Sequence, residues 1–247
     1  TSNSLEMDRN SNPYTFLFVI LLIAVVASAL AITATAMQPA QAENVKNEKM
    51  QNILGTVGIE VARDSASLPF EKYIVKRIAL DNKGNERTDV KAFDIELKKE
   101  LKKPVAEQAF PLYVADVEGS TYYIVPLRGK GLWDAIWGYV ALKEDVNTIK
   151  GAVFDHKAET PGLGAEITQA WFKESFTDEK IMGATGNFVG IDVFKGYQGG
   201  DNKDDNAVDA ISGATITGDG VTKMISERLV NYLPYFKNNT NVKVVSN

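Results

Sequence analysis

The hydrophobic pattern divides the chain into an apolar N-terminal stretch and a longer region in which helical and strand periods alternate. No charged residue occurs from Tyr14 to Ala36, and this stretch exceeds the ~20 residues that cross a bilayer. It predicts a single N-terminal transmembrane helix over residues 14–36. A cleaved signal peptide is the alternative, because Ala34–Ala36 and Ala40–Ala42 resemble cleavage sites. Signal peptides, however, have shorter apolar regions and a basic leader.

The predicted span separates a polar tail from a linker and a domain. After Pro39, a weak apolar face over Glu43–Leu54 predicts a second, membrane-proximal helix that Gly55 ends. The division that we predict is a tail (1–13), the transmembrane helix (14–36), the linker with its helix (37–66), a domain (67–234) and a C-terminal tail (235–247).

The domain pattern predicts an α+β fold with an antiparallel sheet and flanking helices. Apolar runs of strand length alternate with short polar turns, which is typical of an antiparallel meander. The predicted strands cover residues 73–80, 112–117, 122–127, 136–142, 148–155 and 188–194. A short helix is predicted to start at Ser67, and three further helices are predicted over residues 92–102, 165–173 and 220–233. Pro234 is expected to stop the last one.

The composition excludes several classes of function. The net charge is −5 and no basic cluster with interleaved aromatic residues occurs, so a nucleic-acid partner is not expected. The chain has no cysteine, which excludes iron–sulfur ligation and thiol nucleophiles. His156 is the only histidine, so no multi-histidine metal site can form and we predict no metal.

A turn of small residues precedes the last predicted helix. Gly213 lets the backbone of this turn approach a ligand closely. The helix that follows has free N–H groups at its start, and these favour an anion. We interpret the turn as the place where a phosphate binds, whereas an ordinary helix cap is the alternative. Three hydroxyl groups lie just upstream of the predicted helix, those of Ser212, Thr215 and Thr217.

Two further segments with glycines are candidates for the same site. Residues 159–164, Glu-Thr-Pro-Gly-Leu-Gly, suit the approach of an anion or a ring face. Residues 128–134 predict a long loop in which Lys130 and Trp133 border a ligand, or in which Trp133 is simply buried. We predict Trp137 in the core and a structural role for His156.

These segments together resemble a known family. Asp209-x-x-Ser212-Gly213-Ala214-Thr215 is similar to the sequence at which FMN is covalently attached in flavin-binding subunits of the Na+-translocating NADH:quinone oxidoreductase and the related Rnf complexes. The 159–164 loop resembles the second signature of that family. The Gly-Lys-Gly-Leu-Trp-Asp segment and the length resemble the NqrC family of the oxidoreductase more than its Rnf counterpart, RnfG. The glycines of Gly218-Asp219-Gly220 depart from the family, which more often has a serine or asparagine there.

The resemblance implies a cofactor, a tether and a set of site residues. FMN is expected on Thr215 through a phosphoester bond, made by a separate flavin transferase that uses FAD and recognises the motif through Asp209. The 159–164 loop is expected against the isoalloxazine ring. The implied site comprises Asp209, Ser212, Gly213, Ala214, Thr215 and Thr217 in the turn, Glu159, Thr160, Gly162, Leu163 and Gly164 in the loop, and Lys130, Leu132 and Trp133 beside them.

The resemblance also implies a function. The expected function is that of an electron relay without catalytic residues of its own. The relay is expected on the periplasmic side of a bacterial inner membrane. It belongs to a complex whose other subunits take electrons from NADH to quinone and move Na+. The alternatives are the Rnf counterpart and a membrane-anchored structural subunit without flavin. A free-standing flavin reductase needs a nicotinamide site, yet no glycine pair has the third glycine of a Gly-x-Gly-x-x-Gly fingerprint. We therefore expect no NADH oxidation by the isolated chain.

Overall fold

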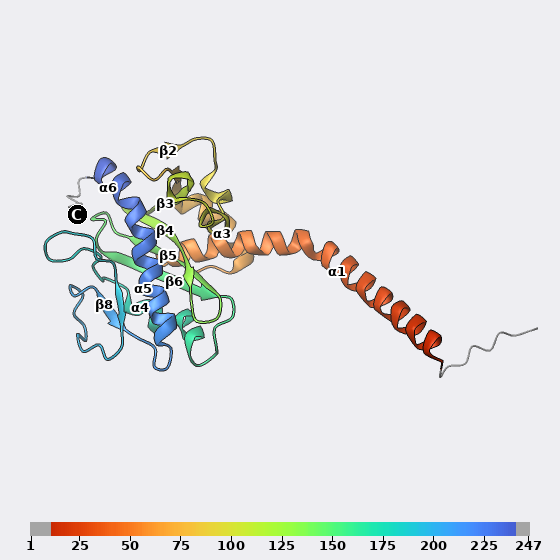
Figure 1. Cartoon of the computed structure of the whole chain (residues 1–247). Helices are drawn as coiled ribbons and strands as arrows, with labels where there is room; N and C mark the ends of the chain where they lie inside the picture. The colour runs from red at the N-terminus through yellow and green to blue at the C-terminus, as the bar shows by residue number, and fades with distance from the viewer. Residues whose placement is uncertain (1–10, 241–247) are drawn as a thin grey trace, which may run out of the picture. The chain divides into compact units, whose positions relative to one another are not determined.

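A computed structural model describes residues 11–240, so parts of both predicted tails lie outside the described residues. Its first element is one continuous helix, α1 (Asn12–Gly55), which ends at the predicted Gly55 (Figure 1). The predicted break between two helices is wrong, because Pro39 lies inside α1. Proline removes one hydrogen bond but keeps a helical φ, and the flanking Met37, Gln41 and alanines favour the helix.

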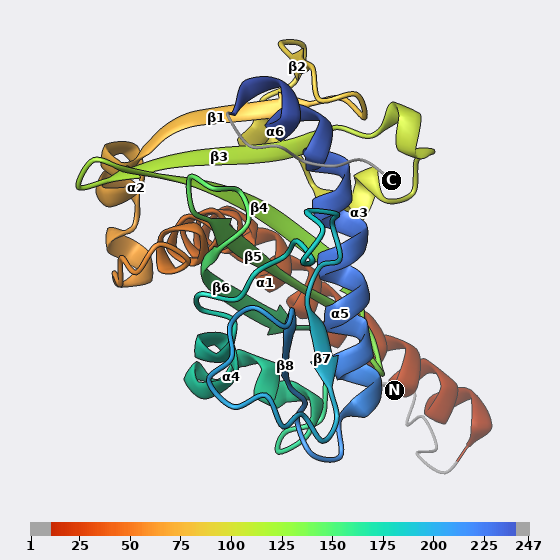
Figure 2. The same ribbon diagram turned by 90° about the vertical axis from the view of Figure 1, so that its left-hand side faces the viewer.

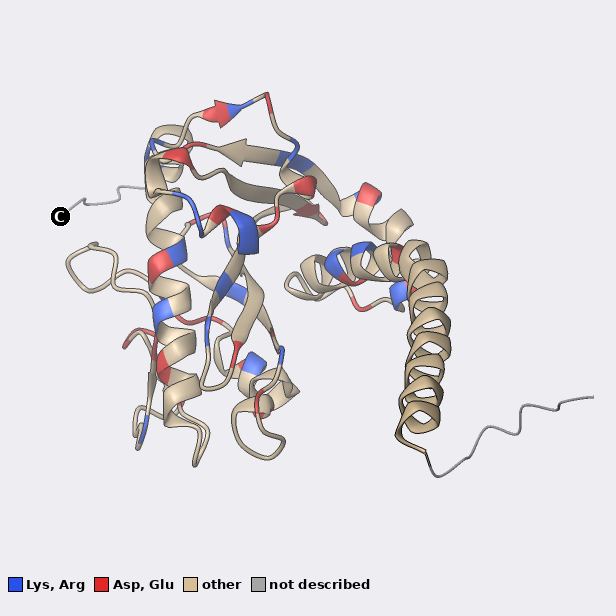
Figure 3. Cartoon of the chain, turned by 45° about the vertical axis from the view of Figure 1, so that its right-hand side comes forward, with Lys and Arg blue, Asp and Glu red and all other residues tan. Residues whose placement is uncertain are grey.

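The N-terminal part of α1 is apolar on every side. In Figure 3 the ribbon of its first turns carries neither the blue of Lys and Arg nor the red of Asp and Glu. The most apolar window has a mean hydropathy of 2.9 with no residue buried. By length and composition this helix can cross a membrane. Within the described residues, 11–46 form one compact unit and 47–240 form a second, the domain.

The domain is built on a six-stranded antiparallel sheet in the order β2-β1-β3-β4-β5-β6 (Figure 2). This confirms the predicted meander and the strand before it. The sequence did not indicate the short β2, which pairs only with the end of β1. The strands are β1 (Ile74–Leu80), β2 (Glu86–Arg87), β3 (Phe110–Val117), β4 (Ser120–Lys130), β5 (Ala135–Leu142) and β6 (Ile149–His156).

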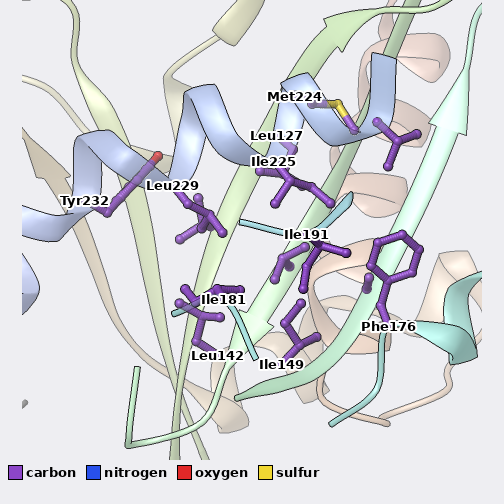
Figure 4. Packing of buried hydrophobic residues seen from close by; sticks show 14 of the residues in the cluster. Leu127, Leu142, Ile149, Phe176, Ile181, Ile191, Met224, Ile225, Leu229 and Tyr232 are labelled. Atoms are coloured by element: carbon purple, nitrogen blue, oxygen red, sulfur yellow. The ribbon is translucent and has the colours of Figure 1, made fainter. Parts of the chain in front are cut away.

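Both faces of the sheet are covered, because apolar residues alternate between two cores. In β3, Leu112 and Val114 join the core under α5 (Thr215–Leu229), whereas Tyr113 and Ala115 join the core formed with the last turns of α1. Figure 4 shows Met224, Ile225 and Leu229 of α5 directed into the first core. With Val221, these residues form the buried apolar stripe of α5. The remaining helices are α2 (Ser67–Tyr73), α3 (Leu97–Glu100), α4 (Ala170–Ser175) and α6 (Leu233–Asn239).

Three predicted elements are shorter than the pattern suggested. Residues 92–102 contain only a 3-10 turn (Ala92–Asp94) and α3, since Ala92 and Ile95 pack together with Ala79 and the chain between the two turns is extended. The predicted helix 165–173 is divided into a 3-10 turn (Gly164–Thr168) and α4. The predicted strand 188–194 contributes only β7 (Asp192–Phe194), which pairs in parallel with β8 (Ala207–Asp209).

The predicted loop over residues 128–134 begins as strand and only its residues 131–134 form a turn. Arg128 pairs with Trp137 and Lys130 with Ala135, so β4 continues to Lys130 and only a tight turn closed by a Gly131 N–H to Asp134 O bond remains. Trp137 is half-buried, with the Arg128 guanidinium 5.9 Å from its ring centre. The prediction that Trp137 belongs to the core is therefore wrong.

Two glycines let α5 pack closely on β4. A Cβ on Gly220 would lie 2.5 Å from the backbone oxygen of Lys130, and one on Gly129 would lie 2.8 Å from Cβ of Met224. This packing explains why glycine stands at position 220 inside a helix, where it lowers helix propensity. Pro234 does not stop α5 but lies in the first turn of α6, after a 3-10 turn at Val230–Tyr232.

We expect Gly220→Ala to lower the free energy of unfolding by about 1–3 kcal/mol, because the new methyl group overlaps the Lys130 carbonyl. Helix propensity alone predicts the opposite, a gain of about 1 kcal/mol. Chemical unfolding of the detergent-solubilised chain measures the difference. Asp219→Ala, on the exposed side of the same turn, is the control and should change stability by no more than about 0.5 kcal/mol. A stabilised Gly220→Ala variant would contradict the packing argument.

Candidate functional site

A cavity of about 260 Å³ lies at the N-terminal end of α5. It is bounded by this helix, by the loop after β6 and by the turn between β4 and β5. The structure thus brings together three segments that the sequence indicated separately. The lining residues are Leu132, Glu159, Thr160, Leu163, Gly164, Lys195, Gly213, Ala214, Thr215, Ile216 and Thr217.

Helix α5 begins at Thr215, five residues before the predicted start at Gly220. Gly213 adopts the left-handed conformation (φ 76°), which turns the chain into the helix. Ala214 occupies the N-cap position, and no side chain of the described residues caps the helix. The cavity therefore borders a helix end whose first N–H groups lack intrahelical acceptors, and such an end favours an anion.

The buried Glu159 joins the three segments. Its Oε2 accepts a hydrogen bond from the Thr217 hydroxyl at 2.7 Å, and its Oε1 accepts one from the Trp133 backbone N–H at 3.0 Å. Glu159 and Thr217 are both almost fully inaccessible to solvent. Because each oxygen of a buried carboxyl needs a partner, this arrangement fixes the loop against both the helix and the turn.

Two glycines make room for the Glu159 side chain. A Cβ on Gly131 would lie 2.6 Å from Oε1, and one on Gly164 would lie 2.3 Å from Oε2 and 2.5 Å from the Thr217 hydroxyl. Glycine at these two positions thus permits a buried carboxylate here. His156 supports the same loop, because its Nδ1 accepts a hydrogen bond from the Glu159 backbone N–H at 3.1 Å.

Five predicted site residues do not line the cavity. The Trp133 ring is exposed and lies beside it, donating from Nε1 to the Thr160 hydroxyl at 3.2 Å, so the alternative of a buried Trp133 is wrong. The others are Lys130 at the end of β4, Gly162 in the turn of the loop, Asp209 at the end of β8 and Ser212 in the turn before α5.

Two lining residues were missed by the sequence reasoning. Ile216 lies inside the turn motif, but only the early start of α5 places it at the cavity. Lys195 follows β7 in a glycine-rich segment without a recognisable motif. Its contact with the cavity depends on the parallel β7–β8 pair, for which the sequence carried no signal. Apart from the buried Glu159, Lys195 is the only charged residue that lines the cavity within the described chain.

Comparisons with known proteins point to one family. Residues 131–230 match the FMN-binding domain family. An NqrC protein of the Na(+)-translocating NADH-quinone reductase from Haemophilus ducreyi is 30% identical over 204 residues, covering 76% of this chain and 78% of that protein. The chain belongs to the NqrC family. The protein of the same name from Chlamydia muridarum is 38% identical over 123 residues, which are 45% of this chain and 39% of that one.

The fold agrees with this membership. A crystal structure of NqrC from Parabacteroides distasonis superposes with a TM-score of 0.72 at 35% identity, covering 79% of this chain and 94% of that one. The resemblance to the NqrC family and the predicted α+β class, an antiparallel sheet with flanking helices after an apolar N-terminal helix, are therefore confirmed. The contact of the individual site residues with FMN stays a prediction.

Proposed function

We propose that this chain is the FMN-carrying NqrC component of a Na+-translocating NADH:quinone oxidoreductase and passes electrons between other subunits. The observation that carries the proposal is the cavity at the start of α5, where the two signature segments meet around Thr215. FMN supplies the capacity to accept and release electrons. The protein must hold the ring, exclude water from one side of it and set the charges around it.

The residues present fit a phosphate tether at Thr215. Its side chain is exposed, lines the cavity and stands at the first position of α5. The Thr217 hydroxyl is buried and already donates to Glu159, and Ser212 lies outside the cavity lining. Of the three hydroxyl groups in the turn, that of Thr215 alone is both accessible and next to the cavity.

We propose that a flavin transferase attaches the cofactor from FAD. A bond forms between Thr215 Oγ1 and the phosphorus of the FMN half, the pyrophosphate bond breaks, AMP leaves and the hydroxyl proton passes to a base of the transferase. Asp209 and Ser212 are exposed and lie within six residues of Thr215 in the chain, so the transferase can recognise them. Intact mass and an absorption spectrum after expression with and without the transferase test this proposal. A structural subunit without flavin would remain unmodified in both cases.

The proposed placement is a single anchor in the inner membrane, with the domain in the periplasm. Residues 14–36 contain no Asp, Glu, Lys, Arg or His. They therefore offer no ion pathway, and Na+ transport must reside in other subunits. We expect the anchor to remain in the mature protein and the domain to be cleaved by protease added to spheroplasts. N-terminal sequencing that finds Glu43 as the first residue, or a domain protected from external protease, would contradict this placement.

We expect the isolated, FMN-loaded chain not to be reduced by NADH, whereas dithionite bleaches its flavin absorbance. The residues that line the cavity offer no glycine fingerprint for a dinucleotide, so electrons must arrive from a protein partner. Stopped-flow absorbance measures both reductions, and dithionite is the control for an accessible flavin. Bleaching by NADH as fast as the turnover of the whole complex would support the free-standing reductase instead.

A further inference from the structure

Large apolar side chains gather around the cavity. Leu132, Leu163 and Ile216 line it, yet each is at least 40% exposed. The exposed Trp133 ring is hydrogen-bonded to the lining residue Thr160, and the exposed Phe194 directly precedes the lining residue Lys195. We define the apolar rim as these five residues, Leu132, Trp133, Leu163, Phe194 and Ile216.

The rim is a concentration of exposed apolar surface. From Asn47 to Thr240 the structure describes eleven exposed large hydrophobic residues, and five of them belong to the rim. Single exposed apolar residues are ordinary, but a contiguous group marks an interaction site. Trp133 and Leu163 are also held in place, the first by its bond to Thr160 and the second by close packing on Gly213.

The cavity is small for the cofactor that we propose. Its volume of about 260 Å³ lies below the ~300–1,000 Å³ of typical ligand pockets. A group tethered at Thr215 therefore reaches the mouth of the cavity, which the rim residues Leu132, Leu163 and Ile216 border. Figure 2 shows β7, which carries Phe194, beside the first turns of α5, which carry Ile216.

We propose, on the basis of the function given above, that the apolar rim is the docking face for the protein that exchanges electrons with the flavin. The partner presents an apolar patch with a carboxylate at its margin. The carboxylate follows from Lys195, the exposed cation at the cavity, for which the described residues provide no salt bridge.

The size of the rim favours a short redox contact over a second copy of this chain. A stable, free-standing interface uses roughly 20–30 residues on each side, whereas weak redox contacts lie at the low end of interface size. Five apolar residues suit the second class. A partner in the same membrane needs no larger interface, because anchoring both proteins in one membrane raises their effective concentration.

The test uses the complete membrane complex carrying Phe194→Glu, since Phe194 does not line the cavity. We expect NADH-dependent reduction of the covalent flavin, followed by stopped-flow absorbance, to slow about tenfold, as for an aromatic anchor of an interface. Covalent loading and the flavin potential should stay as in wild type. Leu68→Glu, at an exposed apolar residue outside the rim, is the control and should leave the rate unchanged. Lys195→Glu should also slow the reduction, because it repels the carboxylate.

Other outcomes overturn the proposal in recognisable ways. A wild-type rate in both the Phe194→Glu and Lys195→Glu complexes shows that no partner docks on the rim. A dimer of the loaded chain that Phe194→Glu dissociates assigns the rim to a second copy, and quenching of Trp133 by brominated lipid assigns it to the bilayer. If the wild-type chain carries no flavin, the proposed function itself fails.

Discussion

Thr215→Ala is expected to abolish covalent flavin attachment completely while leaving the chain folded. The Thr215 hydroxyl is the only group of this side chain that can form the phosphoester bond. The side chain is exposed at the first position of α5. Its removal therefore costs little packing, and surface substitutions of this kind change stability by about 0.5 kcal/mol or less. Coexpression with the transferase, followed by intact mass measurement, gives the result directly.

Thr215→Ser is the matched control, because it restores a hydroxyl at the same position and should restore at least part of the loading. Ser212→Ala should keep the flavin on Thr215, although slower recognition by the transferase is expected from its place in the motif. If the alanine variant at position 215 still carried the flavin, the attachment site would have to be Ser212 or Thr217. Thr217 would then first have to break its bond to Glu159.

Local patterns were sufficient for five of the six strands of the sheet and for the apolar N-terminal part of α1. The alternation in β3, with Leu112 and Tyr113 on opposite faces, is visible in the sequence because a strand repeats every two residues. The lack of charge over residues 14–36 is equally local. In contrast, the shortness of α3 depends on Ala92 and Ile95, just before it, packing with Ala79 of β1 and Ala109. Such contacts override helix propensity and are invisible in a local window.

Nine of the eleven residues that line the cavity were predicted from the sequence, but their geometry was not. The two motifs named Glu159 and Thr217, but their hydrogen bond joins residues 58 positions apart, and no spacing rule connects them. The helix was predicted to start at about Gly220, whereas Gly220 lies inside α5 and its missing side chain makes room for the Lys130 backbone. Lys195 carried no signal, because a lone lysine in a polar loop resembles any solvated residue.

The Glu159 carboxylate leads to the second large effect that we expect. Glu159→Ala leaves the buried Thr217 hydroxyl and the Trp133 N–H without their acceptor, and each such group costs about 1–3 kcal/mol. We therefore expect the free energy of unfolding to fall by about 2–4 kcal/mol. Because loop and helix are no longer joined, the rate of flavin attachment should fall by about tenfold or more.

Glu166→Ala is the matched control for Glu159→Ala. Glu166 also accepts a backbone hydrogen bond in this loop, from Gly162 at 2.9 Å, but that bond is solvent-exposed, so its loss should cost about 1 kcal/mol or less. Unfolding by denaturant and the time course of attachment, both on the full chain, measure the two effects. Equal behaviour of the two alanine variants would show that Glu159 does not join the segments as we infer.

Glu159→Gln separates the charge of this residue from its hydrogen bonds. The amide oxygen can accept from the Trp133 N–H and the amide nitrogen can donate to the Thr217 hydroxyl, so the segments stay joined and loading should be retained. In the proposed arrangement, with the ring against this loop, the substitution removes a negative charge near the ring, and a buried anion disfavours added electrons. The flavin potential of the glutamine variant should therefore become more positive in a spectroelectrochemical titration, whereas that of Glu166→Gln should not move. A glutamine variant with an unchanged potential would mean that the Glu159 charge does not act on the flavin, even if its hydrogen bonds hold the site together.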